Sequence, residues 1–160
     1  MPLRRIAYGF TIRLPVPRSR AYRWAIDYQP GDLELMGLRA TRRVERLAED
    51  LILLTDSFSV DPFNVAPRAR TVKVKLVHLL PRRYAWTSTH IAGPARYSQF
   101  IYELIPDGRR YSRLRYTGVQ VERVKSPSTG KSIATRARTL RSEDYRGWRR
   151  FARAMAKDLA

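Results

Sequence analysis

Apolar and polar residues alternate in the first segment of the chain. In residues 6–14, IAYGFTIRL, the side chains at even positions are apolar or aromatic, whereas Thr11 and Arg13 fall on the other face. A period of two that is rich in aromatic and β-branched residues predicts a half-buried strand. The prolines of PVP at 15–17 end this strand, because proline lacks the N–H that a sheet requires.

A helical spacing follows these prolines. Ala21, Tyr22, Ala25 and Ile26 recur at intervals that place them on one face of a short helix. The sequence YQPGD ends that helix, and LELMGL after it fits either a second short helix or a loop. We therefore expect one or two short helices after the first strand.

Short strand-like runs separated by turns fill the chain from about residue 38 to residue 122. The dipeptide ED separates two of these runs, DPFNVAP at 61–67 is expected to be a loop, and PDGR has the residues of a tight turn. Because the connections are close to hairpin length, we expect the strands to pair antiparallel. In RTVKVKLVHLL, the side chains expected to point inward are Val72, Val74, Leu76 and His78, and those expected to point outward are Lys73 and Lys75.

The last twenty residues carry the period of an amphipathic helix. Ser142 is a favourable N-cap, and Glu143 and Asp144 follow in the first turn, where the helix dipole favours acids. We therefore expect the helix to begin near Ser142, after a polar loop, KSPSTGKS at 125–132, that lacks the first glycine of a phosphate-binding loop. The apolar stripe of the helix consists of Tyr145, Trp148, Ala152, Met155 and Leu159, widened by Phe151.

The apolar face of an antiparallel sheet must be buried against another element, and only the terminal helix is long enough to cover it. The chain of 160 residues suits one domain, spanning 1–160. We predict an α+β fold in which a curved antiparallel sheet of about six to seven strands grips a long C-terminal helix, with one or two short helices after the first strand. Such a sheet closes around one end of the helix more readily than it fills the other end, so a cavity is expected between them.

The order of these elements resembles that of the START-like superfamily, also called Bet v 1-like, SRPBCC, helix-grip or polyketide cyclase/dehydrase. The resemblance rests on the first strand with PVPRSRAYRWAIDY after it, on the late strand pair YSQFIYELIPDGRRYSRLRYTGVQVE and on the last helix. It implies a domain that holds an apolar or amphipathic ligand, such as a lipid, sterol or polyketide. Some members are cyclases or hydrolases and others bind RNA. The chain departs from many members in having no glycine in RLAEDLILL, between its early strands.

The expected function follows from the cavity and not from a catalytic motif. We expect it to bind a hydrophobic or amphipathic small molecule, lipid-like or polyketide-like. One alternative is a cyclase- or hydratase-type enzyme that uses the same cavity, with a histidine or a buried carboxylate acting on the ligand; the sequence does not decide whether the chain is an enzyme. The candidate ligand-binding residues are Trp24, His78, Tyr84, Trp86, His90, Phe100, Tyr102, Tyr116, Trp148 and Phe151.

The remaining ionisable residues offer little chemistry. His78 and His90 are the only histidines and lack the paired spacing of metal ligands, so neither a metal nor another cofactor is expected. Asp56 and Glu103 lie within strand-like runs, and we expect arginines to pair with them. The absence of cysteine excludes disulfides and thiolate chemistry.

Basic residues outnumber acidic ones by 32 to 14, which gives a formal net charge of +18. Either the surface attracts polyanions, or a thermophilic or GC-rich source uses arginine freely; the spread of arginine along the whole chain favours the second interpretation. No signal peptide or membrane span is evident, so a cytoplasmic location is expected. Binding of nucleic acid or another anionic partner is an alternative through a basic outer face formed by Arg13, Arg43, Lys73, Lys75, Arg113 and Arg115.

Overall fold

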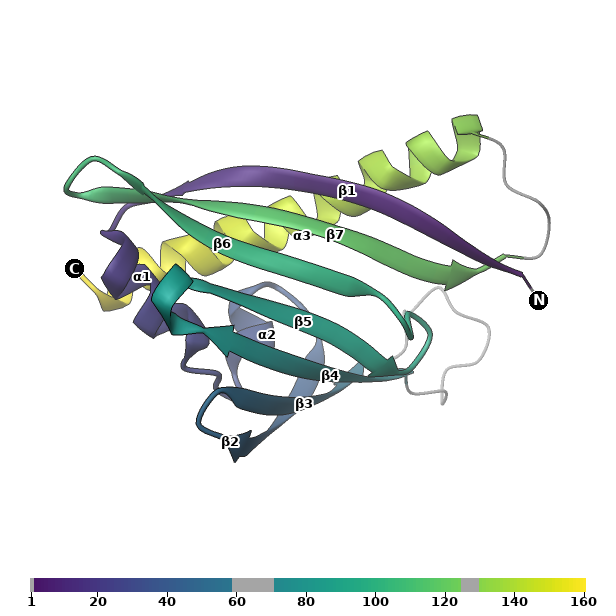
Figure 1. Ribbon diagram of the computed structural model, residues 1–160, viewed down its shortest axis with the longest axis horizontal. Helices are drawn as coiled ribbons and strands as arrows, with labels where there is room; N and C mark the ends of the chain where they lie inside the picture. Colours follow the sequence, from purple (N-terminus) through teal and green to yellow (C-terminus); the bar gives the residue numbers. More distant parts are fainter. Residues whose placement is uncertain (1, 59–70, 125–129) are drawn as a thin grey trace.

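In the computed structural model, which describes residues 2–58, 71–124 and 130–160, the chain forms one seven-stranded sheet and three α-helices (Figure 1). The elements in chain order are β1 (Leu3–Leu14), α1 (Arg18–Ile26), α2 (Asp32–Leu35), β2 (Ala40–Ala48), β3 (Leu51–Phe58), β4 (Thr71–Leu80), the 3-10 turn η1 (Pro81–Arg83), β5 (Ala85–Ala92), β6 (Gln99–Asp107), β7 (Tyr111–Arg123) and α3 (Gly130–Asp158). The expected loop at 61–67 lies outside the described residues.

All neighbouring strands are antiparallel, in the order β1-β7-β6-β5-β4-β3-β2. β1 pairs with β7 over its full length, from Leu3 opposite Arg123 to Leu14 opposite Ser112. Figure 1 shows α3 running behind β1 and β7, with α1 and α2 on the same side of the sheet. The prediction of a curved antiparallel sheet that grips a C-terminal helix, with short helices after the first strand, is confirmed.

The predicted start of the last helix is wrong. α3 begins at Gly130, twelve residues before Ser142, so residues 130–132 of the expected polar loop are helical; residues 125–129 lie outside the described part of the chain. The apolar stripe of the helix continues upstream of Tyr145 through buried Leu140 and the half-buried Ala137 and Ile133, at helical spacing. Ser142 therefore lies inside a helix that already packs on the sheet, and a favourable capping residue does not by itself start a helix.

The predicted orientation of β4 is inverted. Val77 and Leu79 are buried, whereas His78 is exposed, so Lys73 and Lys75 share the inner face of the sheet. Five consecutive residues from Leu76 to Leu80 include four aliphatic side chains, so apolar residues fall on both faces of this strand and periodicity alone cannot choose between them. The pairing of β4 with β3 determines which face of β4 points inward. Asp56 on the inner face of β3 lies opposite Lys73, so the lysine side of β4 also faces inward.

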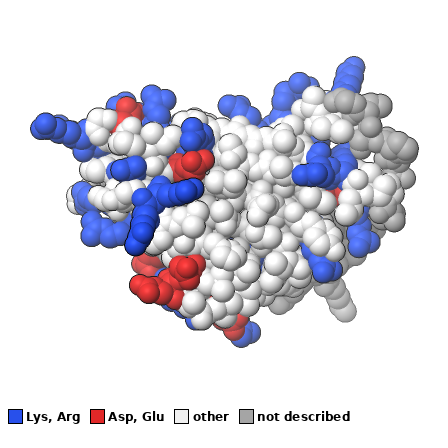
Figure 2. Space-filling view, in the orientation of Figure 1, with Lys and Arg blue, Asp and Glu red and all other residues white. Residues whose placement is uncertain are grey.

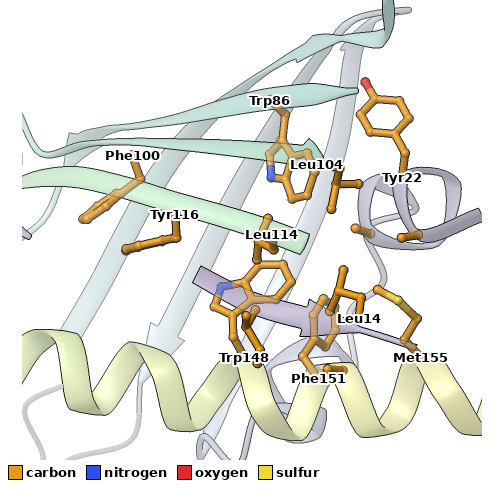
Figure 3. Close-up of a cluster of buried hydrophobic side chains, with 14 of the residues drawn as sticks. Leu14, Tyr22, Trp86, Phe100, Leu104, Leu114, Tyr116, Trp148, Phe151 and Met155 are labelled. Carbon is orange, nitrogen blue, oxygen red and sulfur yellow. The ribbon is translucent and has the colours of Figure 1, made fainter. Parts of the chain in front are cut away.

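Close packing fills the end of the interior that lies near α1. Tyr22 of α1, Leu14 of β1 and Met155 of α3 are buried there, and Figure 3 shows their side chains converging with Leu114 of β7. The prediction that the stripe on the last helix meets the sheet is correct for this end. None of the helices in the described residues is long and apolar enough to cross a membrane.

Candidate ligand-binding pocket

A cavity of about 530 Å³ lies between the sheet and the helices α2 and α3. Its aromatic wall is built from alternate residues of three neighbouring strands and from α3. Trp86 of β5 stacks on Tyr102 of β6 with ring centroids 4.9 Å apart, and Trp148 of α3 lies 5.7 Å from the same Tyr102 ring. Figure 3 shows Trp86 pointing down from the sheet and Trp148 pointing up from the helix.

Residues on β6 and β7 extend this wall. The rings of Phe100 and Tyr116 stack with centroids 5.6 Å apart, because their positions on adjacent strands face the same side of the sheet. Gly118 is opposite Phe100, and a Cβ at this position would collide with the Phe100 ring. The glycine therefore allows the ring to lie across β7 and shape the cavity.

A buried ion triad stands at the polar end of the cavity. Arg42 of β2 donates to both carboxylate oxygens of Asp56, from Nε to Oδ1 at 2.7 Å and from Nη2 to Oδ2 at 2.9 Å. Lys75 of β4 places its Nζ 2.8 Å from Oδ2. Burial alone would raise the pKa of Asp56, but the hydrogen bond from Arg42 and the charge of Lys75 outweigh it and hold that pKa below its ordinary value. Asp56 is therefore an anion, and the expected arginine pairing is correct.

A second carboxyl enters the cavity from α3. Asp144 Oδ2 accepts hydrogen bonds from Tyr8 at 2.5 Å and from Tyr116 at 2.9 Å. Burial raises the pKa of Asp144, and the two tyrosine hydrogen bonds and the nearby lysine charges offset this only in part. The carboxyl therefore takes up a proton more readily than an exposed aspartate does.

His90 contributes an unpaired polar atom to the cavity. The side chain is 7% exposed, and its Nδ1 has no hydrogen-bond partner among the residues that the structure describes. Burial and the charges of Lys75 and Lys73 lower the pKa of His90 to about 3. The imidazole is therefore neutral at physiological pH, with one nitrogen that donates and one that accepts.

Lys73 lies beside this histidine on the same inner face. Its Nζ stands 5.1 Å from the ring centroid of Phe58, and no hydrogen bond or ion pair joins it to another residue in the described ranges. Burial lowers the pKa of Lys73, and the charges of Asp144, Asp56 and Glu143 oppose that shift. Lys73 is thus a cation in the cavity without a directly bonded anion.

The rim of the cavity lies between the segment after α2 and the outer side of α3. Gly37, Leu38, Arg146 and Arg150 line it and are all exposed. Gly37 has φ +82, which favours glycine, and the Arg150 guanidinium packs so closely that a Cβ there would collide with it.

The structure brings seven of the ten candidate residues to the cavity and leaves three outside it. Trp24 packs on Phe151 with centroids 4.6 Å apart but does not reach the cavity, and it donates to Asp158 instead. Tyr84, with φ 49, contacts Tyr22 and Arg18 at the packed end. His78 is on the outer face for the reason given above. The seven that line the cavity are Trp86, His90, Phe100, Tyr102, Tyr116, Trp148 and Phe151.

The most polar residues of the cavity were absent from the candidate set. Lys73 and Lys75 were assigned to an outer face and Asp144 to a helix terminus, as charged residues usually are, and Arg42 was given no role. Tyr8 was placed correctly on the inner face of the first strand, and only its partner was unknown. Asp56 offered the one usable signal, because a carboxylate with inward parity requires cations beside it.

The other predictions on charged residues have mixed outcomes. Glu103 lies on the outer face and pairs with Arg115 at 3.1 Å, as expected for a solvated position. Lys73 and Lys75, which were expected on the basic outer face, line the cavity instead. Figure 2 shows the middle of the outer face largely free of lysine and arginine, which gather toward its ends. No group of three or more histidine, cysteine or acidic residues with metal-binding geometry occurs in the described residues.

Comparison with known proteins identifies the fold. No protein-family model and no curated protein sequence matches the chain. Among solved structures, the aromatase/cyclase ZhuI from Streptomyces sp. R1128 superposes with a TM-score of 0.73 at 9% identity, covering 99% of this chain and 97% of that one. A START superfamily protein from Mycobacterium smegmatis superposes with a TM-score of 0.70 at 9% identity, covering 97% and 99%.

A third structure extends the comparison to plants. Norcoclaurine synthase from Thalictrum flavum, in complex with dopamine and hydroxybenzaldehyde, superposes with a TM-score of 0.66 at 8% identity and covers 97% of this chain and 88% of that one. The chain has the START-like, Bet v 1-like fold. The family resemblance seen in the sequence is thereby confirmed at the level of fold. At these identities the likeness carries no residue roles.

Proposed function

We propose that the protein binds a hydrophobic or amphipathic small molecule, lipid-like or polyketide-like, between the sheet and α3. The observation that carries this proposal is the cavity of about 530 Å³ with an aromatic wall and a few polar groups at one end. Small-molecule sites typically have volumes of roughly 300–1,000 Å³ and this mixture of apolar walls and polar handles. An aromatase/cyclase and a synthase bound to two aromatic compounds share the fold, which supports the same general class of ligand.

A dye-binding experiment with a cavity-filling variant tests the proposal. N-phenylnaphthylamine is neutral and fluoresces in apolar sites, and energy transfer from Trp86 and Trp148 on the cavity wall reports its proximity. Ser88 also lines the cavity, so Ser88→Phe should fill it and weaken dye binding by at least about tenfold, roughly 1.4 kcal/mol. Thr87→Phe adds the same ring to the opposite face of β5 and should leave binding unchanged. Wild-type protein that binds no dye, or equal binding by both variants, contradicts the proposal.

A second candidate function is enzymatic, of the cyclase or hydratase type. It is favoured by the presence in one cavity of a neutral His90 with an unpaired nitrogen and of Asp144 with a raised pKa. A neutral imidazole N–H can donate a hydrogen bond to a ketone oxygen, and a carboxylate whose pKa is raised is a stronger base for the α-proton, which is the pairing that enolisation requires.

Proton exchange on a simple ketone tests this second candidate. Benzylacetone in deuterium oxide should lose its α-proton signals faster with wild-type protein than with buffer alone, and Asp144→Asn should abolish the acceleration while dye binding persists. Exchange at the buffer rate with wild-type protein would leave binding as the function that the geometry supports.

A further inference from the structure

The polar end of the cavity carries more positive than negative charge. In the triad, one carboxylate, Asp56, bonds two cations, Arg42 and Lys75, and the three side chains are only 0%, 7% and 18% exposed. A buried charge is costly unless an opposite charge accompanies it. The triad therefore leaves one positive charge without an anion of its own.

Lys73 adds a second positive charge at the same place. It lies opposite Asp56 in the register of β3 and β4, two residues from Lys75 on the same face. Both oxygens of Asp56 are already engaged, by Arg42 and by Lys75, and no ion pair to Lys73 occurs in the described residues. Two adjacent lysines thus face the cavity with a single shared carboxylate between them.

Among the described residues, the other acids of the cavity form no ion pair with these lysines. Asp144 shares its Oδ2 between two tyrosine hydroxyls, and burial raises its pKa; its charge acts on Lys73 without a direct ion pair among the described residues. Asp32 accepts a backbone hydrogen bond from Gln29, and burial raises its pKa as well. Glu143 is exposed at the start of the rim. Of the three cations at this end, Arg42 and Lys75 share one carboxylate, and Lys73 has no bonded anion among the described residues.

His90 marks the same spot from the neighbouring strand. It lies directly opposite Lys75 in the β4–β5 register, and its unpartnered Nδ1 is on a side chain that is only 7% exposed. A buried polar atom without a partner among the described residues points to a group supplied from outside the chain. Because the imidazole is neutral, it can donate one hydrogen bond to an oxygen without adding charge.

The type of cation also fits a ligand contact. Of the 32 basic residues only five are lysines, and two of these five are Lys73 and Lys75. The lysine ammonium is a compact charge on a flexible stem, and its three N–H donors can rotate to bond an oxygen of a bound molecule.

We propose that the ligand is an organic anion, an apolar or aromatic body that carries one carboxylate-like or sulfonate-like group, and that this group contacts Lys73, Lys75 and His90. The proposal rests on the proposed binding function and adds the ligand's charge and its orientation. The acidic group lies against β4 and β5, and the apolar body lies along Trp86, Tyr102 and Trp148.

A matched pair of dyes tests the charge preference. Anilinonaphthalene sulfonate and N-phenylnaphthylamine share one ring system and differ by the sulfonate. Wild-type protein should bind the anionic dye at least about tenfold more tightly, since tenfold corresponds to roughly 1.4 kcal/mol. Lys73→Met should remove most of that preference and leave the affinity for the neutral dye within about twofold. Unchanged neutral-dye binding also shows that the variant is folded.

A surface lysine provides the control. Lys131 is exposed in the first turn of α3, so Lys131→Met removes the same charge without touching the cavity and should leave both affinities unchanged. Equal affinity of wild-type protein for the two dyes, or an equal loss in Lys131→Met and Lys73→Met, overturns the inference while cavity binding stands. Binding of neither dye overturns the proposed function itself.

Discussion

The inner face of the sheet has two halves that differ in composition and in packing. In the half near α1 the inward side chains are apolar and fully packed, whereas the other half carries charged and polar side chains beside aromatic ones and borders the cavity. The packed half contains Ile52, Val77, Leu79, Leu104 and Leu114; the polar half contains Asp56, Lys73, Lys75, Ser88, His90 and Gln120.

The change from apolar to polar happens within single strands. On β4 the inner face runs from Leu79 and Val77 to Lys75 and Lys73, and antiparallel pairing places similar switches on the neighbours at the same level. Ion-paired and hydrogen-bonding side chains cannot interdigitate with aromatic rings from α3 as aliphatic ones do, so this half stays open. The cavity is thus a consequence of which residues occupy one half of an otherwise regular sheet.

The largest expected effect comes from removing the anion of the polar half. Asp56→Ala leaves Arg42 and Lys75 buried without their shared carboxylate, and it should lower the free energy of unfolding by about 3–5 kcal/mol, measured by urea denaturation. Asp56→Ala combined with Lys75→Met should recover part of the loss, because one unpaired charge is removed. A loss below about 1 kcal/mol in the single variant would show that the triad does not hold the polar half together.

Shortening a side chain in the packed half should have the next largest effect on the free energy of unfolding. Leu114 is 0% exposed, so Leu114→Ala should lower the free energy of unfolding by about 3 kcal/mol through lost contacts and a new void. Ser88→Ala, on the cavity wall, should change it by less than about 1 kcal/mol, because no close-packed neighbour is lost. Equal losses of unfolding free energy in Leu114→Ala and Ser88→Ala would show that the two halves do not differ in packing.

Acid should weaken the fold through His90. Its pKa is about 3 in the folded protein and near 6.5 in the unfolded chain, so the unfolded state binds the proton first as pH falls. The contribution of neutral His90 to the free energy of unfolding is complete above pH about 6.5. It is lost progressively toward pH about 3, at up to roughly 1.4 kcal/mol per pH unit. Urea unfolding between pH about 6.5 and 4.5 should show this slope in wild-type protein and lose it in His90→Gln. Asp144 and Asp32, whose pKa values burial raises, act in the opposite direction.

The smallest effect is expected on the outer face. Glu103 and Arg115 form a solvent-exposed ion pair at 3.1 Å, so Glu103→Ala should lower the free energy of unfolding by only about 0.2–1 kcal/mol, and less at high salt. The same denaturation assay compares it with Asp56→Ala. A loss as large as that of Asp56 would mean that burial does not set the difference between the two carboxylates.

The sequence predicts the architecture better than the site, for physical reasons visible in particular residues. On β5, Trp86, Ser88 and His90 alternate with Thr87 and Thr89, so a period of two places Trp86 and His90 on one face. β4 has aliphatic residues on both faces, and only its pairing with Asp56 on β3 determines that the lysines turn inward. Local patterns thus succeed where one face is clearly apolar.

Contacts between distant segments set the rest of the site. Tyr8 and Asp144 are separated by 136 positions, and no local pattern indicates that the phenol donates to that carboxyl. The acids near Ser142 suggested a helix start, whereas Asp144 lies within α3 and points into the cavity. Polar residues inside a cavity break the rule that polar side chains lie on the surface, so sequence patterns misplace them. They are also the residues that a ligand would contact.

The central claim, that a small molecule occupies the open half and not the packed half, can be tested with two methionine methyl groups. Met36 lines the cavity, whereas Met155 is 0% exposed in the packed half. In protein with carbon-labelled methionine methyls, saturation with N-phenylnaphthylamine should shift the Met36 signal and give contacts between that methyl and the dye, while the Met155 signal stays in place. A bound dye that leaves Met36 unperturbed, or that shifts Met155 instead, would contradict the account.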